Sequence, residues 1–440
     1  MRPFPRNPIL TAMVLVALSG CSSGFSLGDI NPFAEKEERL PGERQAILLE
    51  TDPLVADPQA AQVPALPAAR ANADWPQSGG PASNAPGHLA LGSAPKQAWS
   101  ARAARGSNDE ARLSASPIVY QGRVFVMDTA AQVSAYSLTG GRQWSVSLRP
   151  EEEEADVISG GGLAADGGRL FAATGFGKVV ALDPASGGQL WVSEVTVPIR
   201  SAPTASGGHL FIIGADNQLY ALSAEDGSQV WSYRGIPEAA GLIANASPAV
   251  SGTTVVAPYS SGEVIAFNAD SGEPMWVDSL TRTQLLTTLS GINDVAARPV
   301  IDGGMVFAVS VSGRMVAVDE KTGERLWTRN IAGTQAPAVA GETAYVVSLN
   351  GQLVALDRAS GKVRWLTRLP GEASVRWGGP VVAGGRLWLT SSNKKMVAVN
   401  ALTGEVGGQY ELGAPSHIAP IVASGGLFVL LDDGTLTAFY

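Results

Sequence analysis

The stretch that decides the fold is residues 178–191, KVVALDPASGGQLW, because its pattern recurs until the end of the chain. The mostly apolar residues 178–182 suit a half-buried strand. Asp183 opens a tight turn, Gly187 supplies the positive φ that such a turn needs, and Trp191 lies in the returning strand. The stretch therefore predicts a β-hairpin with an aromatic side chain at a fixed place on its second strand.

Seven copies of this hairpin share the same spacing to within one residue. The turn-opening residues are Ser137, Asp183, Ser223, Asn268, Asp319, Asp357 and Asn400. The turn glycines are Gly140, Gly187, Gly227, Gly272, Gly323, Gly361 and Gly404. Six copies carry a tryptophan four residues after that glycine, at Trp144, Trp191, Trp231, Trp276, Trp327 and Trp365, and the seventh has Gly408 there. All seven turn-opening residues can hydrogen-bond their own downstream backbone, so the repeat is a structural unit and not a chance spacing.

A repeat of about 40 to 50 residues that holds a few short strands is typical of a β-propeller, in which each repeat is one four-stranded blade. An apolar strand, which is the second strand of its blade, precedes each hairpin. These strands are expected at residues 123–127, 169–173, 209–213, 254–257, 305–309, 343–347, 386–389 and 427–431. There are eight of them for seven complete hairpins, because the last copy ends at Tyr440 without its outer strand.

The missing outer strand is expected upstream, at residues 96–103 (KQAWSARA), where Trp99 stands one repeat before Trp144. Pairing this strand with the last copy closes the ring and removes two open sheet edges. We therefore predict an all-β fold, an eight-bladed β-propeller of four-stranded blades over residues 96–440, closed by an N-terminal strand.

The N-terminus has the features of a bacterial secretory signal. Residues 1–20 carry two arginines followed by an apolar run that is short for a membrane span. The residues Leu18, Ser19, Gly20 and Cys21 resemble a lipobox, in which the cysteine is lipidated and becomes the mature N-terminus. Cys21 is the only cysteine, and the serine after it implies the outer membrane, with the protein facing the periplasm. The alternative is a chance cysteine after an ordinary signal peptide.

Residues 21–95 are rich in Ala, Pro, Gly and charge, and we expect a lipidated N-terminus and a tether that keeps the propeller clear of the bilayer. Within it, residues 74–77 (DWPQ) are expected to form an aromatic turn on the flank of the propeller. The whole chain has a formal net charge of −9, which argues against nucleic-acid binding.

The tryptophans allow two interpretations. Six of them could form a stacking platform for a planar cofactor or sugar. Alternatively, each ring fills the space between adjacent blades where neighbouring sheets diverge. Their fixed distance from a turn favours the second interpretation, because it serves every repeat and not one site.

The pattern Ala-x-Asp-x-x-(Ser/Thr)-Gly-x-x-x-Trp, found at residues 181–191, 317–327 and 355–365, resembles the repeat of pyrroloquinoline-quinone (PQQ) enzymes and their non-enzymatic relatives. Behind a lipobox, a propeller of this length is similar to the BamB family of outer-membrane assembly lipoproteins. This resemblance implies a scaffold without a cofactor that binds the central β-barrel assembly subunit (BamA-like) and assists the folding and insertion of barrels. Nascent outer-membrane proteins are a second expected partner.

The competing class is a PQQ-dependent dehydrogenase or another quinoprotein enzyme, which needs a cation site beneath its quinone. His88, His209 and His417 stand in separate parts of the repeat, so their spacing does not predict a metal site or an acid–base pair. The acidic run 151–154 is expected to be solvated in an interblade loop. We therefore predict that the protein is not an enzyme, with no catalytic residue, no metal and no cofactor.

Two interblade connections are long and apolar, residues 234–246 and 279–298. An exposed apolar patch rimmed by charge is typical of an interface, so we expect a partner to contact residues there. These are Leu242, Ile243, Leu286, Leu289 and Asp294. The resemblance places Leu242 and Asp294 at contact positions, whereas Ile243 stands where the family has an arginine. The alternative is that these side chains lie beneath neighbouring loops.

Overall fold

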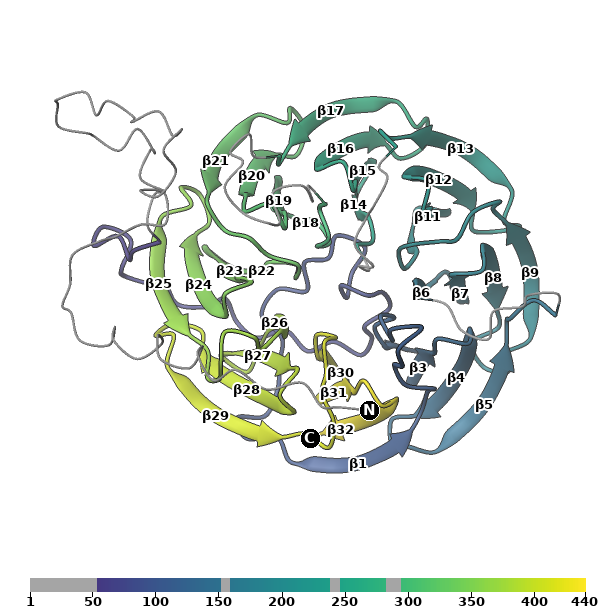
Figure 1. The fold of residues 1–440 in the computed structure, drawn as a ribbon, viewed down its shortest axis with the longest axis horizontal. Coiled ribbons are helices and arrows are strands. Elements are labelled where there is room, and N and C mark those ends of the chain that lie inside the picture. Colours follow the sequence, from purple (N-terminus) through teal and green to yellow (C-terminus); the bar gives the residue numbers. More distant parts are fainter. Residues whose placement is uncertain (1–53, 152–158, 238–245, 282–293) are drawn as a thin grey trace, which may run out of the picture. The chain divides into compact units, whose positions relative to one another are not determined.

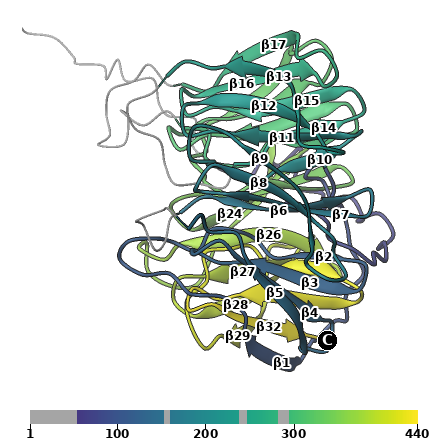
Figure 2. The same ribbon diagram turned by 90° about the vertical axis from the view of Figure 1, so that its right-hand side faces the viewer.

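The computed structural model describes residues 54–151, 159–237, 246–281 and 294–440. In these residues 32 strands form eight antiparallel sheets of four strands each, arranged around a centre (Figure 1). Figure 2 shows the same ring from its side. The predicted all-β, eight-bladed propeller is thereby confirmed. Nowhere in the described ranges is there a helix with the length and apolar character needed to cross a membrane.

Each blade runs from an inner to an outer strand. Blade 1 is β2 (Ile118–Tyr120), β3 (Arg123–Met127), β4 (Gln132–Ser137) and β5 (Arg142–Ser147). Blade 2 is β6 (Gly161–Asp166), β7 (Arg169–Thr174), β8 (Lys178–Leu182) and β9 (Gln189–Glu194). Blade 3 is β10 (Thr204–Ser206), β11 (His209–Ile213), β12 (Gln218–Ser223) and β13 (Gln229–Arg234). Blade 4 is β14 (Ala249–Ser251), β15 (Thr254–Pro258), β16 (Glu263–Asn268) and β17 (Pro274–Ser279).

The second half repeats this order. Blade 5 is β18 (Val300–Asp302), β19 (Met305–Val309), β20 (Met315–Asp319) and β21 (Arg325–Arg329). Blade 6 is β22 (Ala338–Ala340), β23 (Thr343–Val347), β24 (Gln352–Asp357) and β25 (Val363–Arg368). Blade 7 is β26 (Trp377–Ala383), β27 (Arg386–Ser391), β28 (Lys395–Asn400) and β29 (Val406–Glu411). Blade 8 is β30 (Ile421–Ala423), β31 (Gly426–Leu430), β32 (Thr435–Phe439) and β1 (Gln97–Arg102).

The ring closes as predicted, with the first strand of the chain as the outer strand of the last blade. β1 pairs antiparallel with β32, and Trp99 lies opposite Ala438. This places the tryptophan of blade 8 in the register that Trp144 has in blade 1, opposite Ala135. The pairing covers the sheet edge that β32 would otherwise expose.

The hydrophobic core is divided into clusters between neighbouring blades. The middle strands are buried almost throughout, whereas most outer strands alternate between exposed and half-buried residues. Between blades 1 and 2, for example, Phe125, Leu163 and Leu170 are completely buried. Each sheet therefore depends on both neighbours for its apolar contacts, since an isolated small sheet buries too little surface to be stable.

The tryptophans pack where the repeat predicts, between adjacent blades. A Cβ atom added at Gly187 would lie 2.7 Å from the Trp144 ring, and one at Gly272 would lie 2.6 Å from Trp231. Each of these turn glycines has a φ of +74°. The glycine is therefore needed for the turn conformation and for the close approach of the ring from the preceding blade.

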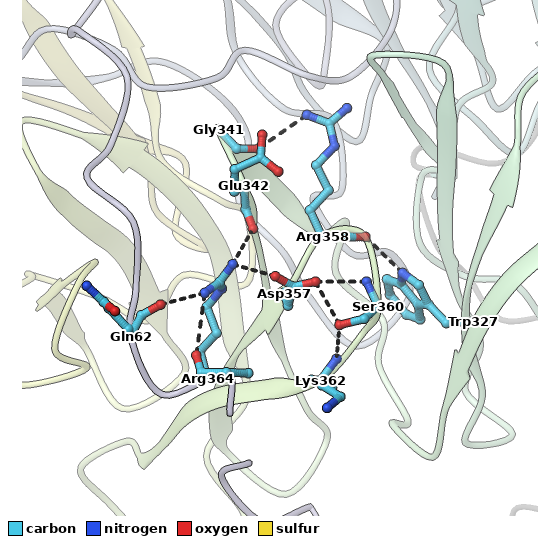
Figure 3. A network of polar contacts seen from close by, with 10 residues as sticks. Gln62, Trp327, Gly341, Glu342, Asp357, Arg358, Ser360, Lys362 and Arg364 are labelled. Atoms are coloured by element: carbon cyan, nitrogen blue, oxygen red, sulfur yellow. Dashed lines mark hydrogen bonds and ion pairs between the residues drawn. The ribbon is translucent and has the colours of Figure 1, made fainter. Parts of the chain in front are cut away.

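The indole N–H groups add a polar contact to this packing. Six of the seven donate to turn carbonyls of the following blade, in the pairs Trp99 to Leu138, Trp144 to Pro184, Trp191 to Ala224, Trp231 to Ala269, Trp276 to Glu320 and Trp327 to Arg358. The seventh, Trp365 Nε1, has no hydrogen-bond partner among the described residues. Figure 3 shows the last of these pairs, with a distance of 2.8 Å between Trp327 Nε1 and the Arg358 carbonyl oxygen. In the same turn the Asp357 carboxylate accepts from the Ser360 N–H at 2.8 Å, as the sequence predicted. This geometry supports the interblade interpretation of the tryptophans.

Blade 7 is the exception, because Gly408 replaces its tryptophan. The Tyr410 ring lies beside this glycine and contacts Trp388 and Phe439 at centroid distances of 5.6 and 6.3 Å. The next blade has no hairpin turn at this place, since its outer strand comes from the other end of the chain. A tryptophan in blade 7 would therefore have no turn glycine to pack against.

Residues 54–95 differ from the expected free tether, because they lie on the propeller. The Asp57 N–H donates to the Val363 carbonyl in the outer strand β25 at 2.8 Å. The Arg364 guanidinium donates to the Gln62 carbonyl at 2.7 Å and pairs with Asp357 (Figure 3). We call residues 54–95 the N-terminal segment.

The N-terminal segment then crosses the middle of the ring, where it appears as the purple to blue trace in Figure 1. Residues 72–89 hydrogen-bond to the inner strands of blades 1 to 5, 7 and 8. The inner-strand residues contacted are Val119, Ala165, Ala205, Val250, Ile301, Val382 and Val422. At Ala205 the Gln77 side-chain amide both donates and accepts, at 2.7 and 3.1 Å, as a peptide group in a sheet does. The inner edges of these sheets are thus paired.

The aromatic turn at residues 74–77 lies at this central position and not on the flank. Trp75 is 3% exposed and packs in the cluster formed by blades 7, 8 and 1. Its backbone pairs with Val119 in both directions, at 2.7 and 2.9 Å. The flank prediction was wrong because it treated the turn as an isolated unit, whereas the open inner edges offer the hydrogen bonds that its backbone needs.

We expect Gly272→Ala to destabilise the propeller by roughly 2–4 kcal/mol, because the new methyl group meets Trp231 and the positive φ is also unfavourable for alanine. Gly252→Ala is the matched control, since its φ is +55° but no atom lies within 4 Å of the added Cβ. It should cost only about 1 kcal/mol. Chemical denaturation of both variants measures the difference, and equal effects would show that the contact with the ring contributes nothing.

Candidate functional site

The two faces of the ring carry different connections. Because consecutive strands are antiparallel, the turn between the second and third strands of a blade lies on the same side as the connection to the next blade. We call this side the loop face. The N-terminal segment contacts the other face, for example at Ser424 and Gly384, which lie in turns between first and second strands.

Both long connections predicted as a partner interface belong to the loop face. Leu242, Ile243, Leu286 and Leu289 lie outside the described residues, as does the lipidation candidate Cys21. The structure describes the ends of both connections and the residue Asp294. These ends show whether the two connections leave the ring at neighbouring places.

The first connection is fixed at its start by Asn217, in the turn between β11 and β12. Asn217 is 2% exposed and has a φ of +61°, a conformation that asparagine tolerates better than most residues. Its side-chain amide donates to the Ile236 carbonyl at 2.7 Å, and its carbonyl accepts from the Gly235 N–H at 3.0 Å. Its Oδ1 atom accepts from the Ser260 N–H at 3.1 Å, which links the turn to blade 4.

Tyr259 joins the two connections. It lies in the turn between β15 and β16 and is completely buried. A Cβ atom at Gly235 would lie 2.5 Å from its ring, and its carbonyl accepts from the Val295 N–H at 3.3 Å. Burial raises the pKa of its phenol far above the ordinary value. One end of each connection thus contacts Tyr259, Gly235 at its ring and Val295 at its backbone carbonyl.

Asp294 lies inside the protein, although we expected it to face a partner. Its side chain is 1% exposed, and its Oδ1 atom lies 3.6 Å from Nη1 of Arg200. Burial lowers the pKa of Arg200, and the Asp294 carboxylate acts against that shift. In this structure Asp294 fixes the end of the second connection, and its contact with a partner stays a prediction.

A second feature of the loop face is a cavity of about 450 Å³ at the centre of the ring, which we call the channel. It is lined by the connections that lead into blades 1, 5, 6, 7 and 8, and it includes Arg112, Arg298, Arg376 and Trp377. None of its lining residues is Asp or Glu. This is unusual in a chain with a net charge of −9.

The channel does not fit a quinone held over a divalent cation. Such a cation needs several carboxylate or amide oxygens, and the lining offers no carboxylate. Across the described ranges there is also no group of three or more His, Cys, Asp or Glu side chains that could hold a metal ion. The three cationic side chains would repel a metal ion from this place.

The three histidines lie in separate environments. His88 accepts from the Gly385 N–H at 2.9 Å and contacts the Pro67 carbonyl at 2.7 Å, within the N-terminal segment. His209 lies 3.8 Å from Asp270, and His417 lies 2.6 Å from Asp432. Of the acidic run, Glu151 is described and exposed, whereas residues 152–154 lie outside the described residues.

The roles of Arg200, Tyr259 and Arg298 were not predicted from the sequence. The first two stand just before or after strands, where the repeat has varied residues, and nothing in the spacing distinguishes them. The available signal was the composition of the interblade connections, because arginine occurs at 112, 298 and 376 without an acid from the channel lining beside it. That signal has meaning only when the ring brings these connections together.

Comparison with known proteins gives a family match over most of the chain. The family model described as "Outer membrane protein assembly factor BamB" matches residues 70–161, 130–367 and 368–440. The relative of that name from Nitrosomonas eutropha is 26% identical over 219 residues, which are 50% of this chain and 52% of the relative. The relative from Burkholderia pseudomallei is 29% identical over 236 residues, 53% of this chain and 59% of the relative. The aligned part thus spans about half the length of these relatives.

Solved structures share the fold with this chain. The BamB structure from Moraxella catarrhalis has a TM-score of 0.67 and 19% identity, and the alignment covers 79% of this chain and 99% of that one. Quinohemoprotein alcohol dehydrogenase from Comamonas testosteroni also has a TM-score of 0.67, with 16% identity over 83% of this chain and 80% of that one. An assembly factor and an enzyme therefore have the same architecture, and the fold alone does not separate these functions.

We expect Asp294→Asn to lower the free energy of unfolding by about 2–4 kcal/mol, because it leaves the Arg200 cation buried without a full opposing charge. Asp302→Asn is the control, since Asp302 pairs with Arg358 at 2.6 Å but its side chain is 36% exposed. The control should cost less than about 1 kcal/mol. Denaturation curves of both variants measure these changes in the free energy of unfolding. An unchanged curve for Asp294→Asn would restore the interpretation of Asp294 as a surface contact.

Proposed function

This chain belongs to the family of outer membrane protein assembly factor BamB, and on that premise we propose that it is a scaffold of the outer-membrane β-barrel assembly machinery. In this role it binds the central barrel assembly subunit (BamA-like) and assists the folding and insertion of β-barrel proteins. It performs no chemistry of its own. Nascent outer-membrane proteins are its second proposed partner.

The observation that carries this proposal is the extent of the family match, which begins within the N-terminal segment and continues to Tyr440. It includes the residues of the N-terminal segment that pair with the inner strands and all eight blades. The ring is therefore matched as a unit, together with the chain that closes its centre, and not as a few isolated repeats.

The alternative is a quinoprotein dehydrogenase, favoured only by the shared architecture with enzymes such as the Comamonas testosteroni protein. The channel argues against it, because a quinone bound over a divalent cation needs oxygen ligands that the lining lacks. Dye reduction by the purified chain in the presence of PQQ tests this alternative. Turnover that depends on the quinone would contradict the scaffold proposal.

For the partner surface we propose the patch on the loop face formed by the two long connections. Their described ends meet around Tyr259, so both leave the ring at blades 3 to 5. At the described edge of this patch Ile236 is 54% exposed, an apolar side chain that is available to a partner. Leu242, Ile243, Leu286 and Leu289 are proposed to continue this apolar surface.

We further propose that Cys21 carries the lipid and that the protein is anchored in the outer membrane facing the periplasm. A single acyl chain binds membranes only weakly, so stable anchoring requires the several chains of a bacterial lipoprotein. The first described residues begin well after this cysteine, at residue 54. All eight four-stranded blades are formed by residues 97–439, and we therefore expect folding to be independent of the lipid.

We expect Cys21→Ala to release the folded propeller from membranes under mild washing, with an unchanged melting temperature. The measurement is fractionation of cells that lack the assembly machinery, which removes retention through a partner. The control is wild type carried through the same washes. A variant that stays in the membrane fraction would contradict lipidation at this cysteine.

We expect Leu242→Glu to keep the wild-type melting temperature and to lose co-purification of the central assembly subunit from detergent-solubilised envelopes. A carboxylate desolvated at the interface without a partner costs on the order of 2–5 kcal/mol, or roughly 30-fold or more in affinity. Ala359→Glu is the matched control, because Ala359 lies in an exposed turn of blade 6 away from the patch.

Three outcomes would count against the proposed patch. A melting temperature lowered by many degrees would show that Leu242 is packed beneath neighbouring loops. Normal recovery of the assembly subunit by Leu242→Glu would place the partner on another surface. Recovery lost equally by Ala359→Glu would show that any added charge disturbs binding, so the result would not identify the patch.

A further inference from the structure

The central channel has a charge that neither the fold nor the scaffold role explains. It is lined by Arg112, Arg298 and Arg376 and by no carboxylate, in a protein whose acidic residues outnumber its basic ones by nine. Interior arginines that only stabilise a fold are ordinarily paired, because an isolated charge is costly to remove from water. The deepest of the three needs an account of its own.

Arg298 is that deepest residue, in the connection that leads into blade 5. It lines both the channel and a smaller cavity that adjoins it at the N-terminal segment. Within the described part of the chain, its Nε atom has no hydrogen-bond partner and no carboxylate pairs with its guanidinium. Burial lowers the pKa of Arg298 to about 10, with no nearby acid acting against the shift. At neutral pH it is still protonated, so an unneutralised cation faces the cavity.

Two more hydrogen-bond donors lie at the same end. The smaller cavity is lined by Trp75 and Ser78 of the N-terminal segment, both buried. Trp75 Nε1 and Ser78 Oγ have no hydrogen-bond partner among the residues that the structure describes. The N-terminal segment thus forms a floor with unused donors, and Arg298 stands between this floor and the channel.

Much of the channel wall is apolar. Leu113, Val347, Leu349, Val375 and Ile418 line it, together with Trp377. At about 450 Å³ the channel is within the size range of sites for small molecules, and it combines a mostly apolar wall with a few polar groups, as such sites do.

We propose that the channel binds the carboxylate group of a ligand with an apolar body, with the carboxylate on Arg298 and the body against Trp377 and the aliphatic wall. A planar guanidinium pairs bidentately with a carboxylate and supplies the missing negative charge. The wall disfavours a bare inorganic anion, which would lose its hydration without gaining apolar contacts. Arg112 and Arg376 lie toward the exposed end, where they attract anions from solution.

This carboxylate has two possible sources, a free organic acid or the C-terminus of a peptide. The chemistry at Arg298 is the same for both. The inference rests on the channel alone and is independent of the proposed partner surface on blades 3 to 5. A failed test of the channel would therefore leave the scaffold proposal unaffected, and the reverse also holds.

The test is calorimetric titration of the full chain, purified in detergent, with 3-phenylpropionate and with its neutral amide. A second pair of probes is an apolar tripeptide with a free C-terminus and the same tripeptide amidated. We expect both acids to bind and each amide to bind at least tenfold more weakly. Whichever acid binds more tightly identifies the source of the carboxylate.

Three variants locate the site. Arg298→Gln should weaken binding of both acids at least tenfold, whereas Arg298→Lys should retain part of the affinity because it keeps the charge. Arg386→Gln is the matched control, since Arg386 begins β27 and does not line the channel. A readout besides binding is thermal unfolding without ligand, where Arg298→Gln should raise the melting temperature because it removes an unneutralised cation.

The proposal is overturned if neither acid binds, if acid and amide bind equally, or if Arg298→Gln binds as wild type. It is also overturned if Arg386→Gln loses as much affinity as Arg298→Gln, since the effect would then be one of overall charge. If Arg298→Gln does not fold, the Arg298→Lys variant and the comparison of acids with amides in wild type still test whether the channel binds a carboxylate.

Discussion

The structure depends on one contact repeated around the ring, a tryptophan ring on the turn glycine of the next blade. Trp231 on Gly272 is typical, with an indole N–H that also donates to Ala269. The ring and the glycine that it contacts belong to different blades, so neither can change without the other. Within a hairpin, the tryptophan stands four residues after the turn glycine of its own blade in six copies. The contact is interrupted at Gly408, beside the blade that is assembled from both ends of the chain. There Tyr410 packs on Phe439 instead.

Much of the fold could be predicted from the sequence because that contact is periodic. The second strands expected at residues 123–127 and 305–309 occur with those bounds, and the closing strand occurs at Gln97–Arg102. The N-terminal segment was predicted poorly for the converse reason. Its backbone makes isolated hydrogen bonds and one two-way bridge with the inner strands. The side-chain amides of Gln77 and Asn84 add contacts at or beside these strands, and the whole pattern has no period. Composition correctly indicates little regular strand there, but it does not indicate that the segment lies on the ring.

The candidate sites, like the fold, could be predicted from the sequence only in part. Length and apolar content identified the two long connections, and most of the residues named in them lie outside the described ranges. Asn217 and Tyr259 hold the ends of these connections. Tyr259 is far from Val295 in sequence, and its carbonyl meets the Val295 N–H only in the folded ring. The channel is harder still to predict, because its character comes from an absence of acids in its lining, contributed by five blades. Such a property belongs to the assembled ring and to no single repeat.

The path of the N-terminal segment also determines how the ring responds to a mechanical load. Among the described residues, a pull on the chain from its N-terminal side is first resisted at residues 54–62, where Asp57 and Gln62 hydrogen-bond to the outer strand of blade 6. The force must then break the hydrogen bonds between residues 72–89 and seven inner strands before tension reaches β1. The strand that closes the ring is therefore shielded from force by the segment in front of it. A propeller that is held by its N-terminus can therefore bear tension at its attachment while its ring stays closed.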